Sequence, residues 1–200
     1  MIKLVIFDIG GVLVDFMEEM YIHYLHDEIM PAISVRRLEK FIMPLMQLMD
    51  FGVLSVPELE SMVSKHFKID GLNLKWVQGY RKLAKPRMRE LEELNAINKR
   101  YRTVILSNIS YSRYAEIQRS YLKMVEVKTR YLSCELRMRK PDPHIYEYVL
   151  EKEGVKPEEA VFADNQIENV IGAEKVGINA VWYRNHRKLM RDLRALGVTP

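Results

Sequence analysis

The sequence predicts an α/β protein, in which helices cover a parallel β-sheet and an α-helical block is inserted near the N-terminus. After residue 86, short apolar runs alternate with helical patterns, which is typical of βαβ units. Residues 16–84 show helical periodicity and no convincing strand. Nearly half of the 200 residues are apolar (48%), enough for the core of one sizeable domain with a modest insertion.

The first predicted strand is the apolar, β-branched run that ends at Phe7. A run this short and continuously apolar is typical of a buried strand in a parallel sheet. Asp8 follows it, and we expect Asp8 at the carboxyl edge of the sheet, where open α/β sheets bind ligands. Gly10 and Gly11 allow a tight turn and close approach of a ligand. Taken alone, Asp8 also fits a turn residue that bonds its own backbone, so a functional role requires partners from other strands.

The inserted block is predicted to be entirely helical. Helices are predicted near residues 16–29, 35–49, 56–67 and 73–83. Breaks or bends are predicted at Pro31, Pro44, Gly52, Gly71 and Gly79. Ser55 with Glu58 three residues later has the pattern of a capping box, and Pro57 favours the first helical turn. This pattern places the start of the third helix.

Two groups in the block have both a structural and a functional interpretation. One helical face carries Met43, Met46 and Met49. Such a stripe is usually packing, with a pocket wall as the alternative. A second group is spaced by four residues on one helix: Glu19, His23 and Asp27. For this group a solvated helix face with i,i+4 pairs is favoured over a metal site.

The remaining elements follow in alternation. Helices are predicted at 86–100 (with Pro86 at its start), 111–120, 143–153 and 168–176, and strands at 103–106, 131–133, 160–163 and 179–182. The basic run 184–194 carries Leu189, Met190 and Leu193 at helical spacing. It is predicted to be a terminal amphipathic helix with a solvated basic face.

Composition restricts the possible partners and location. The net charge is +4 with both signs interspersed, and no basic stripe studded with aromatic residues indicates a nucleic-acid partner. No apolar run approaches the roughly 18–20 residues of a membrane span. The N-terminal residues do not resemble a signal peptide, and Cys134 as the single cysteine agrees with a reducing compartment. We therefore predict a cytoplasmic protein without a nucleic-acid or membrane partner.

Polar residues at the predicted strand ends and in the loops suit one kind of chemistry. They are Asp8, Ser107, Asn108, Lys140, Asp164 and Asn165. Because the carboxyl ends of parallel strands lie along one edge of a sheet, we expect these groups to converge. They suit phosphoryl transfer through a covalent aspartyl-phosphate on Asp8. At 4 Å, two unit charges in a partly buried site repel by roughly 4 kcal/mol, and Lys140 together with Mg²⁺ would offset that repulsion.

The predicted roles divide between metal and substrate. Asp8, the Gly10 carbonyl, Asp164 and Asn165 would supply oxygen ligands to Mg²⁺, with waters completing the octahedron. Lys140 would act with Asp8 in catalysis and also hold a phosphoryl oxygen. The other predicted substrate-binding groups are Ser107, Asn108 and the backbone N–H groups of Ile9 and Gly10.

Taken together, these motifs resemble the haloacid dehalogenase-like (HAD) hydrolase superfamily. The matching segments are 5–13, 105–108, 138–141, 145–146, 161–165, 168–170 and 172–173. The resemblance is to the subfamily with a helical cap between the first two motifs, and runs closest to its sugar-phosphate phosphatase-like members. It implies a Rossmann-like three-layer core formed by residues 1–15 and 85–200, and a mobile helical cap formed by residues 16–84.

For the site, the resemblance implies Asp8 as nucleophile, Ser107 and Lys140 as phosphate binders and a Mg²⁺ site. Two positions depart from the usual pattern. Phosphatases of the superfamily commonly place an Asp at position 10 as general acid and base, worth about 10²–10⁴-fold in rate, although the closest branch also has Gly there. Asn165 stands where a second acidic residue is usual, so Mg²⁺ should bind more weakly.

The sequence therefore predicts a Mg²⁺-dependent phosphatase that hydrolyses a small phosphorylated metabolite. One alternative is a 2-haloacid dehalogenase, in which Asp8 attacks carbon without a metal; Asp164 argues against it. The other alternative is a catalytically weakened protein that binds a phosphate ligand, because a fold alone does not establish activity.

Overall fold

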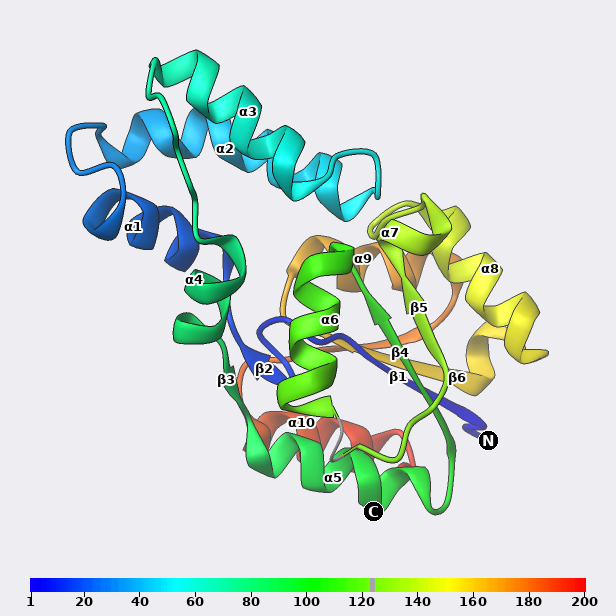
Figure 1. Cartoon of the computed structure of the whole chain (residues 1–200). Helices are drawn as coiled ribbons and strands as arrows, with labels where there is room; N and C mark the ends of the chain where they lie inside the picture. The colour runs from blue at the N-terminus through cyan, green and yellow to red at the C-terminus, as the bar shows by residue number, and fades with distance from the viewer. Residues whose placement is uncertain (123–124) are drawn as a thin grey trace.

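The computed structural model describes residues 1–122 and 125–200. At its centre lies a five-stranded parallel sheet of order β5-β4-β1-β6-β7 (Figure 1). The strands are β1 (Leu4–Phe7), β4 (Arg102–Ser107), β5 (Arg130–Leu132), β6 (Ala160–Asp164) and β7 (Asn179–Trp182). The predicted α/β class with a parallel sheet is confirmed. The chain reaches β1 first but places it in the middle, between β4 and β6.

Helices cover both faces of the sheet, as alternating side chains of β1 show. Val5 and Phe7 pack in one cluster with α5 (Met88–Asn98), α6 (Tyr111–Ser120) and α10 (His186–Ala195). Leu4 and Ile6 pack in another cluster with α8 (Pro143–Glu153) and α9 (Ile167–Val176). Because both faces are buried, every residue of β1 is apolar, as expected for an internal parallel strand. The result is the predicted three-layer Rossmann-like core.

A helical insert, α1–α4, lies between the first strand and the rest of the core. It comprises α1 (Glu18–Glu28), α2 (Val35–Asp50), α3 (Val56–Phe67) and α4 (Trp76–Leu83). In Figure 1, α1–α3 lie beyond the sheet and α4 returns the chain toward it. The predicted capping box is confirmed, since Ser55 and Glu58 exchange hydrogen bonds at the start of α3.

Some predicted boundaries were wrong. Pro86 does not begin a helix: β3 (Lys85–Pro86) pairs antiparallel with β2 (Val14–Asp15), where the chain enters and leaves the insert. A two-residue strand carries no periodic signal, so the sequence could not indicate it. The predicted strand at 131–133 ends at Leu132, because Ser133 begins the short helix α7 (Ser133–Leu136).

Two of the five predicted breaks or bends lie inside helices, as the predicted helix ranges 35–49 and 73–83 already implied. Pro44 is within α2 and Gly79 within α4. A Cβ at Gly79 would lie 2.5 Å from Tyr24 and 2.8 Å from Tyr21, so glycine is required here for close packing of α4 on α1. Gly79 therefore has a packing role that its type alone did not indicate.

A buried ion cluster ties the insert to α6. Arg113 donates to Glu18 at 2.7 Å and also to Asp50, so one core side chain holds carboxylates from α1 and α2. Burial raises the pKa of Asp50, and the Arg113 guanidinium opposes that shift. Ser133 donates its hydroxyl to the Asp50 carbonyl at 2.5 Å, which adds a second tie at the same end of α2.

We expect Arg113→Met to lower the free energy of unfolding by about 3–5 kcal/mol, because it leaves two partly or fully buried carboxylates without their cation. Urea unfolding at pH 7 measures the change. Arg119→Met is the matched control: Arg119 is on the same helix but 70% exposed, and its removal should change stability by less than about 0.5 kcal/mol. Equal effects of the two substitutions would contradict an anchoring role for Arg113.

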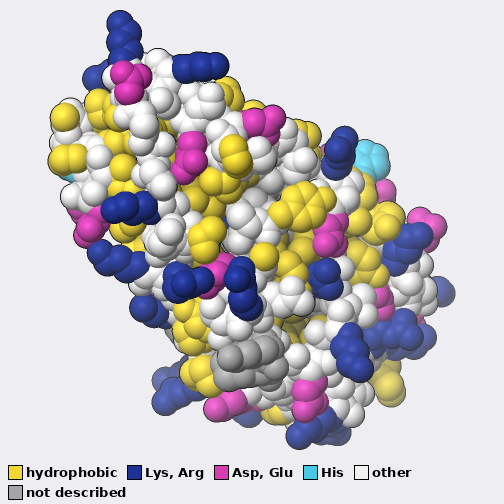
Figure 2. All heavy atoms as spheres, in the orientation of Figure 1, with side chains coloured by type: hydrophobic (Ala, Val, Ile, Leu, Met, Phe, Trp, Pro, Cys, Tyr) yellow, Lys and Arg dark blue, Asp and Glu magenta, His cyan; other side chains and the backbone are white. Residues whose placement is uncertain are grey.

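Charged side chains of both signs are mixed on the surface, as they are along the sequence. Figure 2 shows Lys and Arg side chains spread over this face with Asp and Glu between them. Among the described residues, none of the helices has the length and apolar character needed to cross a bilayer. The predicted terminal helix is confirmed as α10, with Leu189, Met190 and Leu193 buried, and the predicted solvated face of α1 is exposed at Glu19, His23 and Asp27.

Candidate active site

The strand order brings three predicted site residues to one edge of the sheet. Asp8 directly follows the central strand β1, Ser107 ends β4 on one side, and Asp164 ends β6 on the other. The Asp8 N–H donates to the Ala163 carbonyl at 3.0 Å, which extends the β1–β6 pairing up to the carboxylate. Each of the three side chains therefore has its position set by a buried strand.

Lys140 joins these strands from a loop. Its ammonium donates to Asp8 at 2.7 Å, to Asp164 at 2.6 Å and to the Leu106 carbonyl at 3.0 Å. The Lys140 residue is only 1% exposed. All three donor hydrogens of the ammonium therefore have acceptors, two of which are carboxylates from neighbouring strands. The predicted convergence of Asp8, Lys140 and Asp164 is present.

The electrostatics of Asp8 follow from burial and this lysine. Burial raises the pKa of Asp8 to about 6, and the Asp164 charge raises it as well. The Lys140 charge lowers it, as do hydrogen bonds from Lys140 and Ser107. Burial disfavours a charged carboxylate and a cation favours it. Above about pH 6, Asp8 is an anion whose main counter-charge is a single ammonium.

Both carboxylate oxygens of Asp164 accept hydrogen bonds from the protein. One oxygen accepts from Lys140 and, at 3.0 Å, from the Asn169 amide, and the other accepts from the Gln166 N–H at 2.8 Å. Asp164 is fully buried. In this arrangement it orients Lys140, and direct ligation of a metal requires one of these bonds to be exchanged. No role was predicted for Asn169 from the sequence.

The side-chain amide of Asn108 is also hydrogen-bonded within the protein. Its amide donates to the Lys140 carbonyl at 2.9 Å, and its oxygen accepts from the Lys140 N–H at 3.0 Å. The side chain therefore holds the backbone of the Lys140 loop against the end of β4, in addition to lining the cavity. Direct substrate binding by Asn108 stays a prediction.

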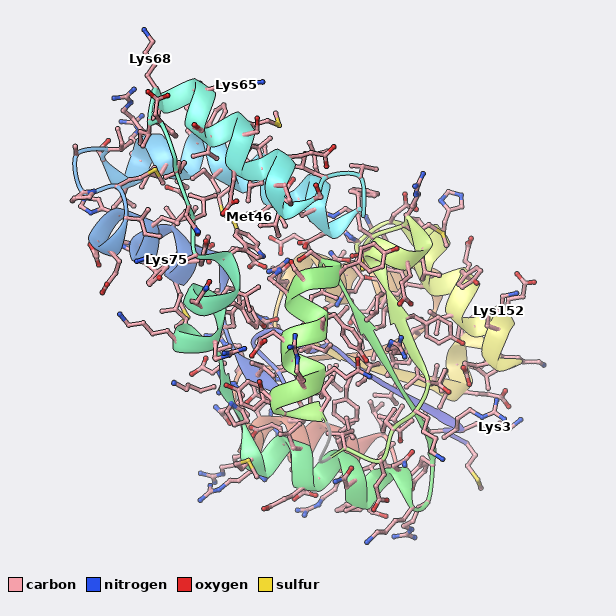
Figure 3. The ribbon with its side chains drawn as sticks, in the orientation of Figure 1. Lys3, Met46, Lys65, Lys68, Lys75 and Lys152 are labelled. Atoms are coloured by element: carbon pink, nitrogen blue, oxygen red, sulfur yellow. The ribbon has the colours of Figure 1, made fainter. Side chains whose placement is uncertain are left out.

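A cavity of about 170 Å³ opens in front of these groups. The predicted residues that line it are Asp8, Gly10, Ser107, Asn108, Lys140 and Asn165. Ile9 is fully buried and does not line the cavity, so phosphate binding by its backbone N–H stays a prediction. Met43, Met46 and Gln47 of α2 line the cavity from the insert, and Figure 3 shows Met46 between the insert helices and α6. Two of the three methionines, Met43 and Met46, therefore line a pocket, as the alternative interpretation of this stripe proposed.

The metal site can be tested against the oxygen donors present. Asp8, Gly10 and Asn165 all line the cavity. A Cβ on Gly11, whose φ is +75°, would lie 2.3 Å from the Asn165 amide, so this glycine allows Asn165 to lie against the turn after β1. Oxygen donors suit Mg²⁺, but only Asp8 among the three is anionic. These oxygen donors are of the type that Mg²⁺ prefers, but they supply little negative charge. Among the described residues, no three acidic, His or Cys side chains lie close enough together to hold a metal ion.

The chain is an α/β protein with a buried carboxylate–lysine arrangement at the carboxyl edge of its parallel sheet. A family model described as haloacid dehalogenase-like hydrolase matches residues 2–177. The chain therefore belongs to the haloacid dehalogenase-like hydrolases and is a hydrolase of that family.

Three relatives illustrate the similarity. The chain is 35% identical to flavin mononucleotide hydrolase 1 of Arabidopsis thaliana over 68 residues, which is 34% of this chain and 28% of that protein. A HAD-like family hydrolase of Porphyromonas gingivalis superimposes with TM-score 0.79 over the whole of both chains at 23% identity. A HAD family enzyme of Bacteroides thetaiotaomicron, crystallised with magnesium and inorganic phosphate, superimposes with TM-score 0.78 over 92% and 95% of the chains at 21% identity. The structural matches establish the fold, and the curated relatives are matched over less than a third of their length.

Proposed function

We propose that the protein is a Mg²⁺-dependent phosphatase that hydrolyses a small phosphate monoester through an aspartyl-phosphate on Asp8. The observation that carries this proposal is the Lys140 ammonium, held between Asp8 and Asp164 at the edge of a cavity. A carboxylate that attacks a phosphate dianion needs positive charge at the reacting atoms. Lys140 would supply that charge to Asp8 and, after exchange of one of its hydrogen bonds, to one phosphoryl oxygen.

The reaction has two displacements at phosphorus. In the first, an Asp8 oxygen forms a bond to phosphorus as the bond to the ester oxygen breaks, and the alcohol leaves. In the second, water attacks phosphorus, the acyl-phosphate bond breaks, and inorganic phosphate and the Asp8 carboxylate are released. Position 10 has no side chain, so the proton for the departing alcohol comes from solvent, which favours good leaving groups.

The remaining residues bind and orient the phosphoryl group. The Ser107 hydroxyl and the backbone N–H groups of Ile9 and Gly10 would hold the other phosphoryl oxygens. Mg²⁺ would be held by Asp8, the Gly10 carbonyl and Asn165, with Asp164 if its hydrogen bonds rearrange, and it would neutralise charge on the phosphoryl oxygens. Its affinity should be low because Asn165 brings no charge.

Residues 16–84 are proposed to act as the cap of this site. Met43, Met46 and Gln47 of α2 already face the cavity, so small shifts of the insert would change what fits. A cap that covers the site excludes water and selects the substrate. Support also comes from two partly matched relatives, a flavin mononucleotide hydrolase and a sesquiterpene phosphatase, whose names indicate small phosphorylated substrates.

The test is phosphate release from a panel of phosphate monoesters, with Mg²⁺ and with a chelator. We expect release only with Mg²⁺ and none from Asp8→Asn. Asn165→Asp should lower the Mg²⁺ concentration for half-maximal rate by about tenfold, because it adds a charged ligand. Metal-independent halide release from 2-haloacids would indicate a dehalogenase instead. Binding of a phosphorylated ligand without turnover in every variant would indicate a binding protein.

A further inference from the structure

Arg139 is a cation at the cavity wall that forms no ion pair with any residue the structure describes. It lines the same cavity as Asp8, Lys140 and Ser107. Its Nε is buried and has no hydrogen-bond partner in the described part of the chain. The guanidinium carbon lies 5.7 Å from the Phe51 ring centroid. This cation–π contact leaves the N–H donors, which lie in the plane of the guanidinium, available to other acceptors. A buried donor without an acceptor costs free energy, and a bound ligand would remove that cost.

Most of the neighbouring charges pair with one another, although Glu19, an exposed carboxylate that also lines the cavity, forms no ion pair with a described residue. Lys140 is bound by Asp8 and Asp164. Glu18 and Asp50 also line the cavity, and both accept hydrogen bonds from Arg113. Arg139 acts on these two carboxylates only through space, where its charge lowers their pKa values to a lesser extent than that of Arg113. Its guanidinium fork is therefore open to an acceptor from outside the protein.

The position of Arg139 is fixed relative to the reacting carboxylate. It directly precedes Lys140, whose backbone N–H and C=O are both held by the Asn108 amide. The same loop thus carries one cation that faces Asp8 and a second that is free. A ligand that places its phosphoryl group at Asp8 would meet Arg139 with another part of the same molecule.

The chemistry of Arg139 and the size of the cavity limit that other part. A guanidinium binds a carboxylate or a phosphate in a bidentate fashion. The cavity of about 170 Å³ is below the about 300–1,000 Å³ of pockets for drug-sized ligands. A cavity of this size suits a short molecule, and a planar carboxylate is the smaller of the two anions that a guanidinium binds in this way.

We propose that Arg139 binds a carboxylate of the substrate, so that the preferred substrates are short phosphorylated carboxylic acids. This inference rests on the proposed phosphatase function and adds a substrate class to it. Asp8, Lys140 and Ser107 act on the phosphoryl end, and Arg139 recognises the acid end. Met43 and Met46 of α2 line the same cavity.

The test compares two esters of equal length, 3-phosphoglycerate and glycerol 3-phosphate, which differ by a carboxylate in place of a hydroxymethyl group. We expect the wild-type protein to prefer the acid by at least about tenfold in kcat/KM, the size of a charge-assisted hydrogen bond, with the difference mainly in KM. Arg139→Met should reduce that preference ratio to about one. Arg137→Met is the matched control, since Arg137 is an exposed arginine two residues away that does not line the cavity, and it should keep the preference.

The outcomes separate this inference from the proposed function. Absence of any preference in the wild type, or a preference that survives Arg139→Met, would overturn the inference even if both esters are hydrolysed. The phosphatase proposal itself is judged on the whole panel of monoesters. If neither of these two esters is hydrolysed, calorimetric binding of both decides the inference: tighter binding of the acid that depends on Arg139 supports it, and equal binding overturns it. Thermal melts check folding, and Arg139→Gln replaces Arg139→Met if the latter unfolds.

Discussion

Lys140→Met is expected to lower the rate of phosphate release by at least about 10²–10³-fold, the loss typical for a group that stabilises charge in the transition state. It is also expected to lower the free energy of unfolding by about 3–5 kcal/mol, because it leaves the buried carboxylates of Asp8 and Asp164 without their shared cation. The pKa of Asp8 should rise above its value of about 6, since the Lys140 charge is the largest influence that lowers it. Fewer molecules would then carry an ionised nucleophile at neutral pH.

Three measurements on one variant check this prediction: phosphate release, urea unfolding, and a pH titration of the Asp8 carboxyl by NMR in chelator-treated protein. Lys152→Met is the control, because Lys152 is an exposed lysine on α8 remote from the cavity (Figure 3). For an ester with no second anionic group, Lys140→Met should cost more rate than Arg139→Met. Equal, small losses from both would contradict the arrangement of the site as described.

Gly10→Asp is expected to raise the rate for esters with poor leaving groups by about 10²–10⁴-fold, the usual contribution of general acid–base assistance. The structure has room for this side chain. A Cβ at Gly10 would meet only the Phe16 carbonyl oxygen, at 3.7 Å, an ordinary contact. Its backbone φ lies outside the left-handed region, and Gly10 lines the cavity next to Asp8. Gly11, by contrast, cannot accept a side chain because Asn165 occupies that space.

The rates are measured with a series of phenyl phosphates of decreasing leaving-group ability. Gly10→Asn is the matched control, because an amide has the same shape but is too weak an acid to protonate the departing alcohol. This variant should show no gain in rate. A flatter dependence on leaving-group pKa in Gly10→Asp than in wild type would indicate proton donation. A rate increase that is equal in Gly10→Asp and Gly10→Asn would show that the effect is steric and that the missing acid does not limit turnover.

Much of the fold was predictable because the core strands are short, apolar and separated by amphipathic helices. The same property placed Asp8, Ser107 and Asp164 at one edge, since a residue that ends a buried parallel strand can only emerge there. The two-residue strands β2 and β3 were missed because pairs this short have no periodicity. Pro44 and Gly79, predicted as breaks or bends, do not interrupt α2 and α4, because neighbouring elements also decide whether a helix continues through such a residue.

The charge pairing within and around the site was not predictable. Arg113 meets Asp50 across 63 positions of the chain, and nothing in the sequence near Arg139 indicates that its guanidinium is left without a carboxylate. Likewise, the Asn108 amide looked like a substrate ligand, and the structure shows both of its ends bonded to the Lys140 backbone. Local patterns report which residues end an element, whereas hydrogen-bond partners depend on which elements pack together.

The sequence by itself determined the class of protein, the succession of buried strands along the chain, and the acidic and basic residues at the ends of those strands. Burial and strand direction follow from local patterns of apolar residues. Only the tertiary structure decided which of those charges neutralise one another. Lys140 is engaged with two carboxylates, Asp164 is occupied on both oxygens, and Arg139 remains open at the cavity. The physical reason is that ion pairing inside a protein depends on distances of a few ångströms between segments far apart in the chain, and on the removal of water around them.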